Sequence, residues 1–274
     1  MRLNMATPSP APLPMGQWAM LNKVPQVTLI FWVIKVMATT VGETAADFLN
    51  DKMHLGLTST SLVMSGLFLV ALAIQLTRRR YVPSIYWTVV VLVSVVGTLI
   101  SDNLVDNLGV TLQTTSIAFA CALALVFFFW WRSEKTLSVH SIRSTKRELF
   151  YWAAILFTFA LGTSAGDLLA EASGLGYGIA DLVFAGLIAL TAVAYYVFKI
   201  DGVLAFWIAY VLTRPLGAST GDLLSQPIKD GGLGFGTTLT SALFLATILG
   251  LVIFLTVSRS GYVAEGDPSQ IPLR

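Results

Sequence analysis

The sequence predicts an all-α integral membrane protein with eight transmembrane helices, built as four parallel two-helix repeats in two duplicated halves. Three observations lead to this fold class. Hydrophobic residues fill 55% of the 274 positions and charged residues only 12%, which is more apolar surface than one soluble core of this length buries. Eight apolar runs are long enough to cross a bilayer, and every second run carries glycine and aspartate in the same register.

The apolar runs define the predicted helices. Because lipid offers the backbone no hydrogen-bond partner, each run must be a helix, since unbroken stretches such as 62–76 lack the alternation of a barrel strand. The spans are expected near residues 26–48, 57–77, 84–105, 112–131, 149–169, 179–198, 203–224 and 237–257.

The membrane domain is expected to cover residues 25–257 between two tails that do not pack. Its repeats are expected at 25–80, 81–135, 146–200 and 201–257. Residues 1–24 contain several prolines and are predicted to be a disordered tail, and residues 258–274 are predicted to be a second polar tail.

Basic residues predict the orientation. Lysines and arginines gather before the first span and in the loops from even to odd spans, whereas the opposite loops contain only Lys52 and Lys229. The positive-inside tendency therefore places both termini in the cytoplasm. We interpret the basic clusters as contacts for lipid headgroups and expect no nucleic-acid partner. The single cysteine, Cys121, excludes an intrachain disulfide.

A repeated motif opens every odd span. An aromatic residue followed by Trp stands at Phe31-Trp32, Tyr86-Trp87, Tyr151-Trp152 and Phe206-Trp207. A glycine follows each Trp by ten residues and an aspartate by fifteen, and a small residue precedes each aspartate. Because small residues let membrane helices approach closely, we assign helix packing to six glycines. They are Gly42, Gly97, Gly162, Gly166, Gly217 and Gly221.

The four aspartates are the main candidate site. They are Asp47, Asp102, Asp167 and Asp222. A charge inside a span costs about 2.5 to 3.5 kcal/mol on insertion scales, yet all four repeats carry one at the same register. Any single aspartate could instead cap its helix at the membrane interface. We expect the odd helices to form an inner cluster that brings the four carboxylates around one axis, with the even helices as an outer shell.

Departures from the repeat mark specialised positions. Glu43 stands one turn before Asp47 on the same helix face, so we add it to the predicted ligands. Lys35 continues this polar stripe, although it could also extend to the interface. Arg214-Pro215 places a permanent cation and a helix-weakening proline near the membrane centre. Arg214 either forms a static ion pair with a carboxylate that holds the bundle together or, with Pro215 beside it, is a counter-charge that gates a bound cation. Asp181 is a further candidate for this gating role.

Carboxylates and hydroxyls provide only oxygen ligands, which suit hard divalent cations such as Mn²⁺, Mg²⁺ and Ca²⁺. The sequence therefore favours a transporter of such a cation, coupled to protons, with manganese export as the preferred case. Two alternatives stay open, namely a scaffold or sensor whose ion pairs serve only assembly, and an intramembrane aspartyl hydrolase. We expect no enzymatic activity and no firmly bound cofactor. The expected partners are the lipid bilayer, a small cation and protons, and an oligomer is left open.

The motifs resemble a known family. Gly-Asp-x-Leu occurs at 166–169 and 221–224, Leu-Gly-Tyr-Gly at 175–178 and Thr-Arg-Pro-Leu-Gly at 213–217. In this order they resemble a family of bacterial multi-pass proteins with four repeated Gly-x4-Asp helical hairpins, described as uncharacterised membrane proteins. The resemblance implies a location in the bacterial inner membrane. The first two repeats depart from it, with Ala46 and Ser101 before their aspartates.

Overall fold

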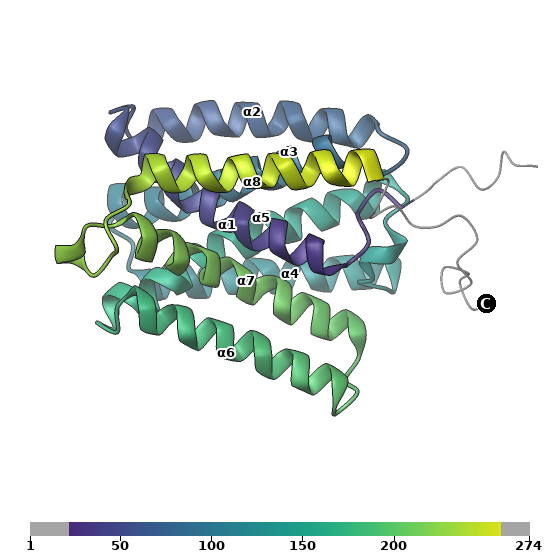
Figure 1. Cartoon of the computed structure of the whole chain (residues 1–274). Coiled ribbons are helices and arrows are strands. Elements are labelled where there is room, and N and C mark those ends of the chain that lie inside the picture. Colours follow the sequence, from purple (N-terminus) through teal and green to yellow (C-terminus); the bar gives the residue numbers. More distant parts are fainter. Residues whose placement is uncertain (1–21, 259–274) are drawn as a thin grey trace, which may run out of the picture.

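The computed structural model describes residues 22–258, and within this range the chain is helical without any strand (Figure 1). The predicted tails at residues 1–21 and 259–274 lie outside the described residues. The long helices are α1 (Leu29–Asp47), α2 (Leu57–Thr77), α3 (Pro83–Asp102), α4 (Leu112–Glu134), α5 (Thr145–Asp167), α6 (Tyr177–Tyr196), α7 (Gly202–Ser225) and α8 (Gly236–Ser258). All eight predicted helices are therefore confirmed, and each is long and apolar enough to cross a membrane.

The odd helices form the centre of the molecule. Helix α1 packs against α3 and α7, and α5 packs against the same two helices, so the four close into a ring. In the most apolar stretch of each odd helix 56–67% of residues are buried, against 11–28% in the even helices. The inner and outer layers therefore agree with the prediction.

The even helices cover this ring in a shifted arrangement. Helix α2 packs mainly on α3, α4 on α5, α6 on α7, and α8 returns to pack on α1. The two helices of one sequence repeat are thus not each other's main packing partners, although the word hairpin implies that they are. Each repeat instead covers the inner helix of the next repeat, and the last covers the first.

Local sequence explains where the helices begin. The side chains of Thr28, Ser144 and Asp201 accept hydrogen bonds from backbone N–H groups in the first turns of α1, α5 and α7, which satisfies donors that a helix start leaves open. Gly56 and Gly176 precede α2 and α6 with φ values of 73° and 78°, a conformation that side chains with a Cβ rarely adopt. The chain therefore reverses sharply at these two glycines.

Three aspartates stand at a change of helix type. Short π-helical turns follow Asp47, Asp102 and Asp167, at η1 (Phe48–Lys52), η2 (Asn103–Asn107) and η4 (Leu168–Ala172). The fourth repeat has no such turn, and a 3₁₀ turn at η5 (Ile228–Asp230) follows α7 after a break. The fourth repeat therefore differs from the other three beside the acidic residues. Single π-helical turns are frequent at functional sites.

The glycines that follow each Trp by ten residues form notches for side chains of a neighbouring helix. A Cβ atom on any of them would overlap a side chain that stands seven residues after the neighbour's Trp. The pairs are Gly42 with Ser94, Gly97 with Phe159, Gly162 with Arg214 and Gly217 with Thr39. The four notches follow the ring of odd helices once around, so the close approach is built into every contact of the ring.

The other two predicted packing glycines differ from this set. A Cβ on Gly221 would lie 3.3 Å from atoms of Thr40, Glu43 and Thr44, whereas the nearest atoms to a Cβ on Gly166 would be 3.7 Å away. The first distance is tight and the second is an ordinary contact. Gly221 therefore permits a close approach between α7 and α1, and Gly166 leaves room for a methyl group.

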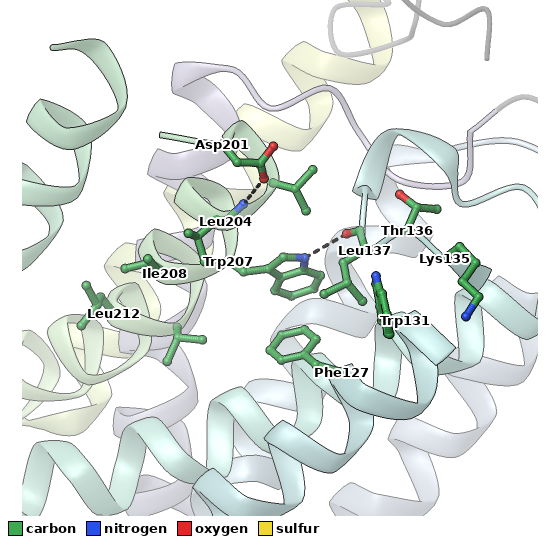
Figure 2. A pocket seen from close by; sticks show the side chains of 12 residues that line it. Phe127, Trp131, Lys135, Thr136, Leu137, Asp201, Leu204, Trp207, Ile208 and Leu212 are labelled. Atoms are coloured by element: carbon green, nitrogen blue, oxygen red, sulfur yellow. Dashed lines mark hydrogen bonds between the residues drawn. The ribbon is translucent and has the colours of Figure 1, made fainter. Parts of the chain in front are cut away.

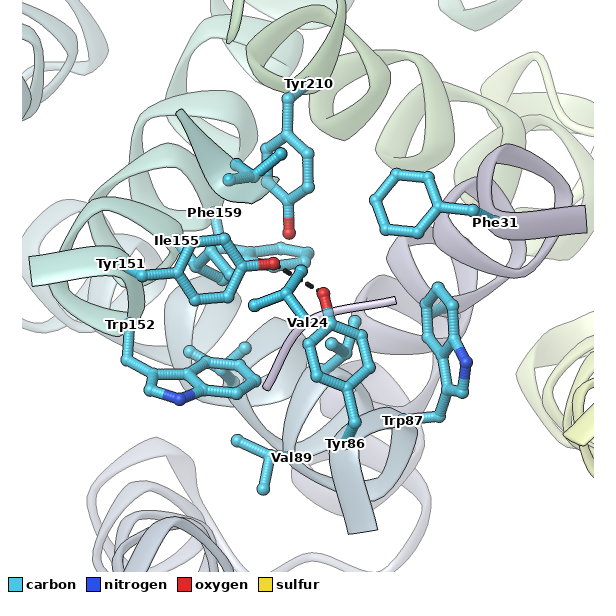
Figure 3. Close-up of a cluster of buried hydrophobic side chains, with 14 of the residues drawn as sticks. Val24, Phe31, Tyr86, Trp87, Val89, Tyr151, Trp152, Ile155, Phe159 and Tyr210 are labelled. Carbon is cyan, nitrogen blue, oxygen red and sulfur yellow. Dashed lines mark hydrogen bonds between the residues drawn. The ribbon is translucent and has the colours of Figure 1, made fainter. Parts of the chain in front are cut away.

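We call the end of the ring where the odd helices begin the aromatic end. Tyr86 and Tyr151 meet there through their hydroxyls at 2.5 Å, and Phe31 and Phe206 lie with their ring centroids 6.2 Å apart. Figure 3 shows the hydroxyls of Tyr86, Tyr151 and Tyr210 pointing toward one another. We call the opposite end, where the aspartates stand, the acidic end.

A buried segment before α1 closes part of the aromatic end and corrects the predicted tail boundary. Lys23 forms a 2.6 Å ion pair with Glu148, and its backbone N–H donates to the carbonyl of Ile142. Asn22 and Val24 are only 5% and 2% exposed. The prediction that a disordered tail reaches residue 24 is therefore wrong for residues 22–24, because a buried ion pair and backbone hydrogen bonds hold them in place.

Candidate cation-binding site

Three carboxylates from three inner helices converge at the acidic end. Oxygen atoms of Glu43 on α1, Asp167 on α5 and Asp222 on α7 all lie within 4.8 Å of one another. Glu43 and Asp222 are 5% and 7% exposed. Three acidic groups at this spacing can share one cation, and we call them the acidic triad.

The other two predicted ligands surround the triad. Asp102 on α3 lies close enough to Glu43, Asp167 and Asp47 for their carboxylates to repel it. Asp47 also interacts with Asp222, and its Oδ2 accepts a 3.5 Å hydrogen bond from Gln226. The structure therefore brings all five predicted carboxylates into one electrostatic group, of which three are close enough to serve one ion.

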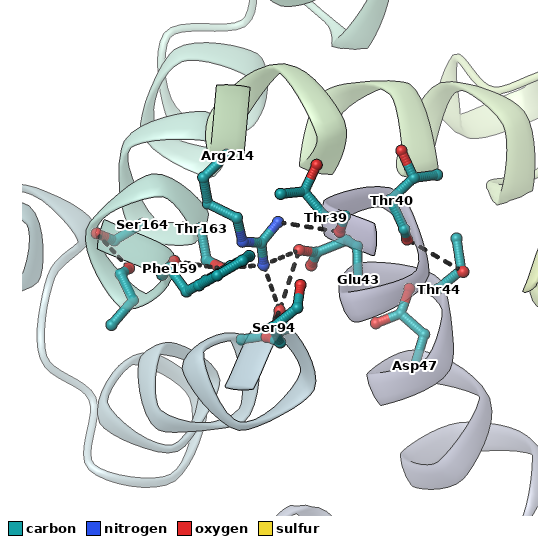
Figure 4. A network of polar contacts seen from close by, with 12 residues as sticks. Thr39, Thr40, Glu43, Thr44, Asp47, Ser94, Phe159, Thr163, Ser164 and Arg214 are labelled. Carbon is teal, nitrogen blue, oxygen red and sulfur yellow. Dashed lines mark hydrogen bonds and ion pairs between the residues drawn. The ribbon is translucent and has the colours of Figure 1, made fainter. Parts of the chain in front are cut away.

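Arg214 is fully buried and lies directly beside Glu43 of the triad (Figure 4). Its Nη2 donates to Glu43 Oε2 at 2.8 Å and to Thr163 Oγ1 at 2.6 Å, and it also contacts Thr98 Oγ1. Its Nη1 lies 3.5 Å from the carbonyl oxygen of Thr39. The guanidinium is thus bound by groups from α1, α3 and α5, on the side of the triad that faces the aromatic end.

The stem of Arg214 is positioned by its neighbours. Its Cβ and Cγ lie in the notch of Gly162, and the face of the Phe159 ring lies 5.6 Å from its guanidinium carbon. Pro215 follows inside α7, which continues as one helix to Ser225. A proline at this position withholds one backbone donor, so the helix is locally weakened next to the buried cation.

Lys35 lies two turns closer to the aromatic end on α1 and is fully buried. Its Nζ donates to Thr213 Oγ1 at 3.0 Å and lies 3.5 Å from the carbonyl oxygen of Tyr210. The rings of Tyr210 and Phe159 are 4.3 Å and 4.7 Å away. The alternative that Lys35 extends to the membrane interface therefore does not fit its position.

Asp181 is separate from the triad. It stands in the first turns of α6, and its Oδ1 accepts a 2.9 Å hydrogen bond from Thr220. It is not one of the acidic residues whose oxygens meet within 4.8 Å in the described part of the chain. Asp181 thus contacts the outer face of α7 and does not take part in the central group.

Two threonines have a role that the sequence did not reveal. Thr98 and Thr163 occupy the register of Glu43 in the second and third repeats, and both hold Arg214. Their shared register was the available signal, because residues at one register face one another across a ring. Ser101 and Ser219 are buried at the acidic end without a hydrogen-bond partner among the described residues. Their two hydroxyl oxygens are therefore available as further ligands for a cation.

A separate groove lies away from the acidic triad. A groove of about 620 Å³ lies between the end of α4 and the start of α7 (Figure 2), where Phe127, Trp131, Trp207 and Leu212 are among its lining residues. Lys135 and Asp201 are the charged residues at its edge. It is lined mainly by apolar side chains and lacks a group of carboxylates, so it is not a second cation site.

A comparison with known families also finds four repeats in the chain. A family model described as a repeat of unknown function (DUF347) matches residues 30–81, 85–136, 150–201 and 205–260. Each matched stretch begins two residues before a Trp of the sequence repeat. No curated protein and no solved structure matches the chain. Because the four matches cover most of its length, the chain belongs to the DUF347 repeat family.

Proposed function

We propose that this chain is a membrane transporter of a hard divalent metal cation, with Mn²⁺ as the favoured substrate and export in exchange for protons as its direction. The observation that carries this proposal is the acidic triad, in which Glu43, Asp167 and Asp222 from three helices place carboxylate oxygens within 4.8 Å of one another. Oxygen-only ligands suit Mn²⁺, Mg²⁺ and Ca²⁺. The chain moves its substrate in this proposal without changing it chemically.

The proposal places the protein in a bacterial inner membrane with both termini in the cytoplasm. Eight long apolar helices support insertion, and the basic loops support the orientation. The aromatic end then faces the cytoplasm and the acidic end faces the opposite side. In this orientation the triad is nearer to the outer surface than to the cytoplasm.

Charge balance in the core supports cation binding. Five carboxylates gather at the acidic end, and Arg214 and Lys35 are the cations buried in the inner ring. Mutual repulsion between carboxylates at this spacing must be relieved by bound cations or protons. A divalent ion and a proton can each relieve this repulsion, so the two compete for the same carboxylates.

Arg214 gives the site a means of release. Its Nη2 already holds Glu43 Oε2, so a divalent cation that binds this carboxylate must share it with, or take it from, the guanidinium. Because Arg keeps its charge at every relevant pH, it acts as a permanent competitor. We expect this competition to keep affinity moderate, as transport requires a site that fills and empties.

Flux into proteoliposomes tests the proposal. Purified protein is reconstituted, and Mn²⁺ entry is followed with a trapped dye for the wild type, Asp167→Asn and Asp222→Asn, with the exposed Asp230→Asn as a matched control. We expect wild-type and Asp230→Asn flux above protein-free vesicles, and a loss in the two triad variants. Flux that persists after all four repeat aspartates are neutralised overturns the transport proposal.

The ion pair also supports a second function. A buried Arg214–Glu43 pair at 2.8 Å is what a scaffold or sensor protein would use to hold its inner helices together. Such a protein would lose stability in Glu43→Gln but would bind no Mn²⁺. Calorimetric titration of the wild type with Mn²⁺ therefore separates the two functions.

A further inference from the structure

Lys35 is a buried amine that the cation site itself does not use. It has 0% exposure, and within the described residues no carboxylate oxygen lies within ion-pair distance of its Nζ. Its contacts are one hydroxyl, one carbonyl oxygen and two ring faces. Buried charges are normally paired, because an isolated ammonium is expensive in an apolar interior.

The repeat does not require this lysine. The equivalent positions in the other repeats are Val90, Ile155 and Tyr210, so the scaffold tolerates apolar and aromatic residues there. A costly residue in one repeat only is a mark of function inside a membrane.

The neighbours of Lys35 are mostly neutral. From α7, Tyr210 contacts it and Arg214 repels it electrostatically. Tyr151 on α5 and Tyr86 on α3 lie at the aromatic end, one turn from its register, and α8 contains no titratable side chain. Glu43, two turns away on α1, is already bound to Arg214. Within the described residues, the Lys35 ammonium is therefore held by one hydroxyl, one carbonyl oxygen and two ring faces, and no carboxylate pairs with it.

We propose that Lys35 is the proton site of the exchange, a role that rests on the proposed function. When a divalent cation enters the acidic triad, its charge adds to that of Arg214 and repels the Lys35 ammonium. The N–H bond breaks heterolytically, the electron pair stays on Nζ to give a neutral amine, and the proton passes to bulk water. Departure of the cation reverses the step, so the metal and the proton alternate.

The two buried cations then have different tasks. An arginine keeps its proton, so Arg214 remains a fixed charge beside the triad, whereas a lysine can lose its proton when buried. Lys35 is eight residues from Glu43 and contacts none of the triad residues. Its charge therefore acts on a bound cation only by electrostatic repulsion at a distance. This separation allows the proton step to be removed without removing a metal ligand.

Proton release on Mn²⁺ addition tests this proposal. Purified full-length protein in weakly buffered detergent solution is titrated with MnCl₂ while a pH dye records released protons, and calorimetry records binding. The variants are Lys35→Met, which removes the charge, and Lys35→Arg, which keeps the charge but cannot release a proton. Lys229→Met, at a lysine with 81% side-chain exposure, is the matched control.

We expect both Lys35 variants to bind Mn²⁺ with affinity within about tenfold of wild type and to release about one proton fewer per bound ion. Lys229→Met should match the wild type. Unchanged proton release in Lys35→Met and Lys35→Arg overturns the role of Lys35 while leaving the transport proposal intact. Absence of Mn²⁺ binding in the wild type overturns both. If Lys35→Met does not fold, Lys35→Arg alone decides, because it preserves the charge.

Discussion

The two glycines on α5 provide a matched test of the ring packing. Gly162 and Gly166 lie one turn apart on α5, and both face residues of α7. A Cβ on Gly162 would overlap the stem of Arg214 and approach Pro215 Cδ to 3.0 Å, whereas a Cβ on Gly166 would lie 3.7 Å from its nearest atoms. We therefore expect Gly162→Ala to be destabilising and Gly166→Ala to be tolerated.

The magnitude follows from the comparison of the two variants. Each gains up to about 1 kcal/mol of helix propensity, and this gain cancels in the difference. Overpacking at Gly162 costs about 1 to 3 kcal/mol, so Gly162→Ala should be less stable than Gly166→Ala by that amount. For a chain of this size, about 2 to 4 °C per kcal/mol predicts a melting temperature about 2 to 12 °C lower.

The assay is thermal unfolding in detergent, followed by tryptophan fluorescence at equal protein and detergent concentrations. Because Trp152 and Trp207 are buried in the inner ring, their emission reports loss of this packing. Equal melting temperatures for the two variants, or a lower one for Gly166→Ala, would refute the notch interpretation and with it the positioning of Arg214.

Three further predictions concern charges. Arg214→Gln should raise Mn²⁺ affinity at least about tenfold, because a unit charge close to a divalent ion costs a few kcal/mol at an effective dielectric of about 20. The same variant should have a lower melting temperature without metal. Calorimetry measures the affinity, and thermal unfolding measures the melting temperature. Asp102→Asn should weaken Mn²⁺ binding by about 10-fold, as expected for a group outside the ligand set, and Asp167→Asn should weaken it by more. Titration of both variants with Mn²⁺ measures the two losses. Equal losses would contradict the assignment of Asp167, but not Asp102, as a direct ligand. Breaking the buried Lys23–Glu148 pair by Lys23→Met should cost about 3 to 5 kcal/mol, while Lys23→Met combined with Glu148→Leu should recover part of it in the same unfolding assay.

Repetition made the fold and much of the site predictable. The spacing of Gly162 and Asp167 from Trp152, shared by all repeats, indicated an inner ring with acidic groups at one end. Glu43 and Arg214 stood out because they break the repeat. These inferences depend on register along a helix, which a sequence displays directly.

What the sequence could not predict depends on distance across the molecule. Which carboxylates approach most closely is decided by side-chain length and helix rotation, so Glu43 joins Asp167 and Asp222 while Asp102 stays outside. The Lys23–Glu148 contact joins residues 125 positions apart, and no periodicity encodes it. The pairing of α2 with α3 was equally hidden, because a short connection permits an even helix to lie along either neighbour.

The shifted covering of the ring makes the order of the repeats cyclic. Because α8 packs on α1 as α2 packs on α3, every repeat gives its second helix to a neighbour and receives one from the other side. The start of α1 and the end of α8 lie at the same end of the bundle (Figure 1). A circular permutant that joins these ends and opens the loop between α4 and α5 would keep every helix contact, whereas a chain cut to two repeats would leave one inner helix uncovered. The helix contacts of this fold therefore do not depend on which repeat comes first in the chain, but they do depend on the number of repeats.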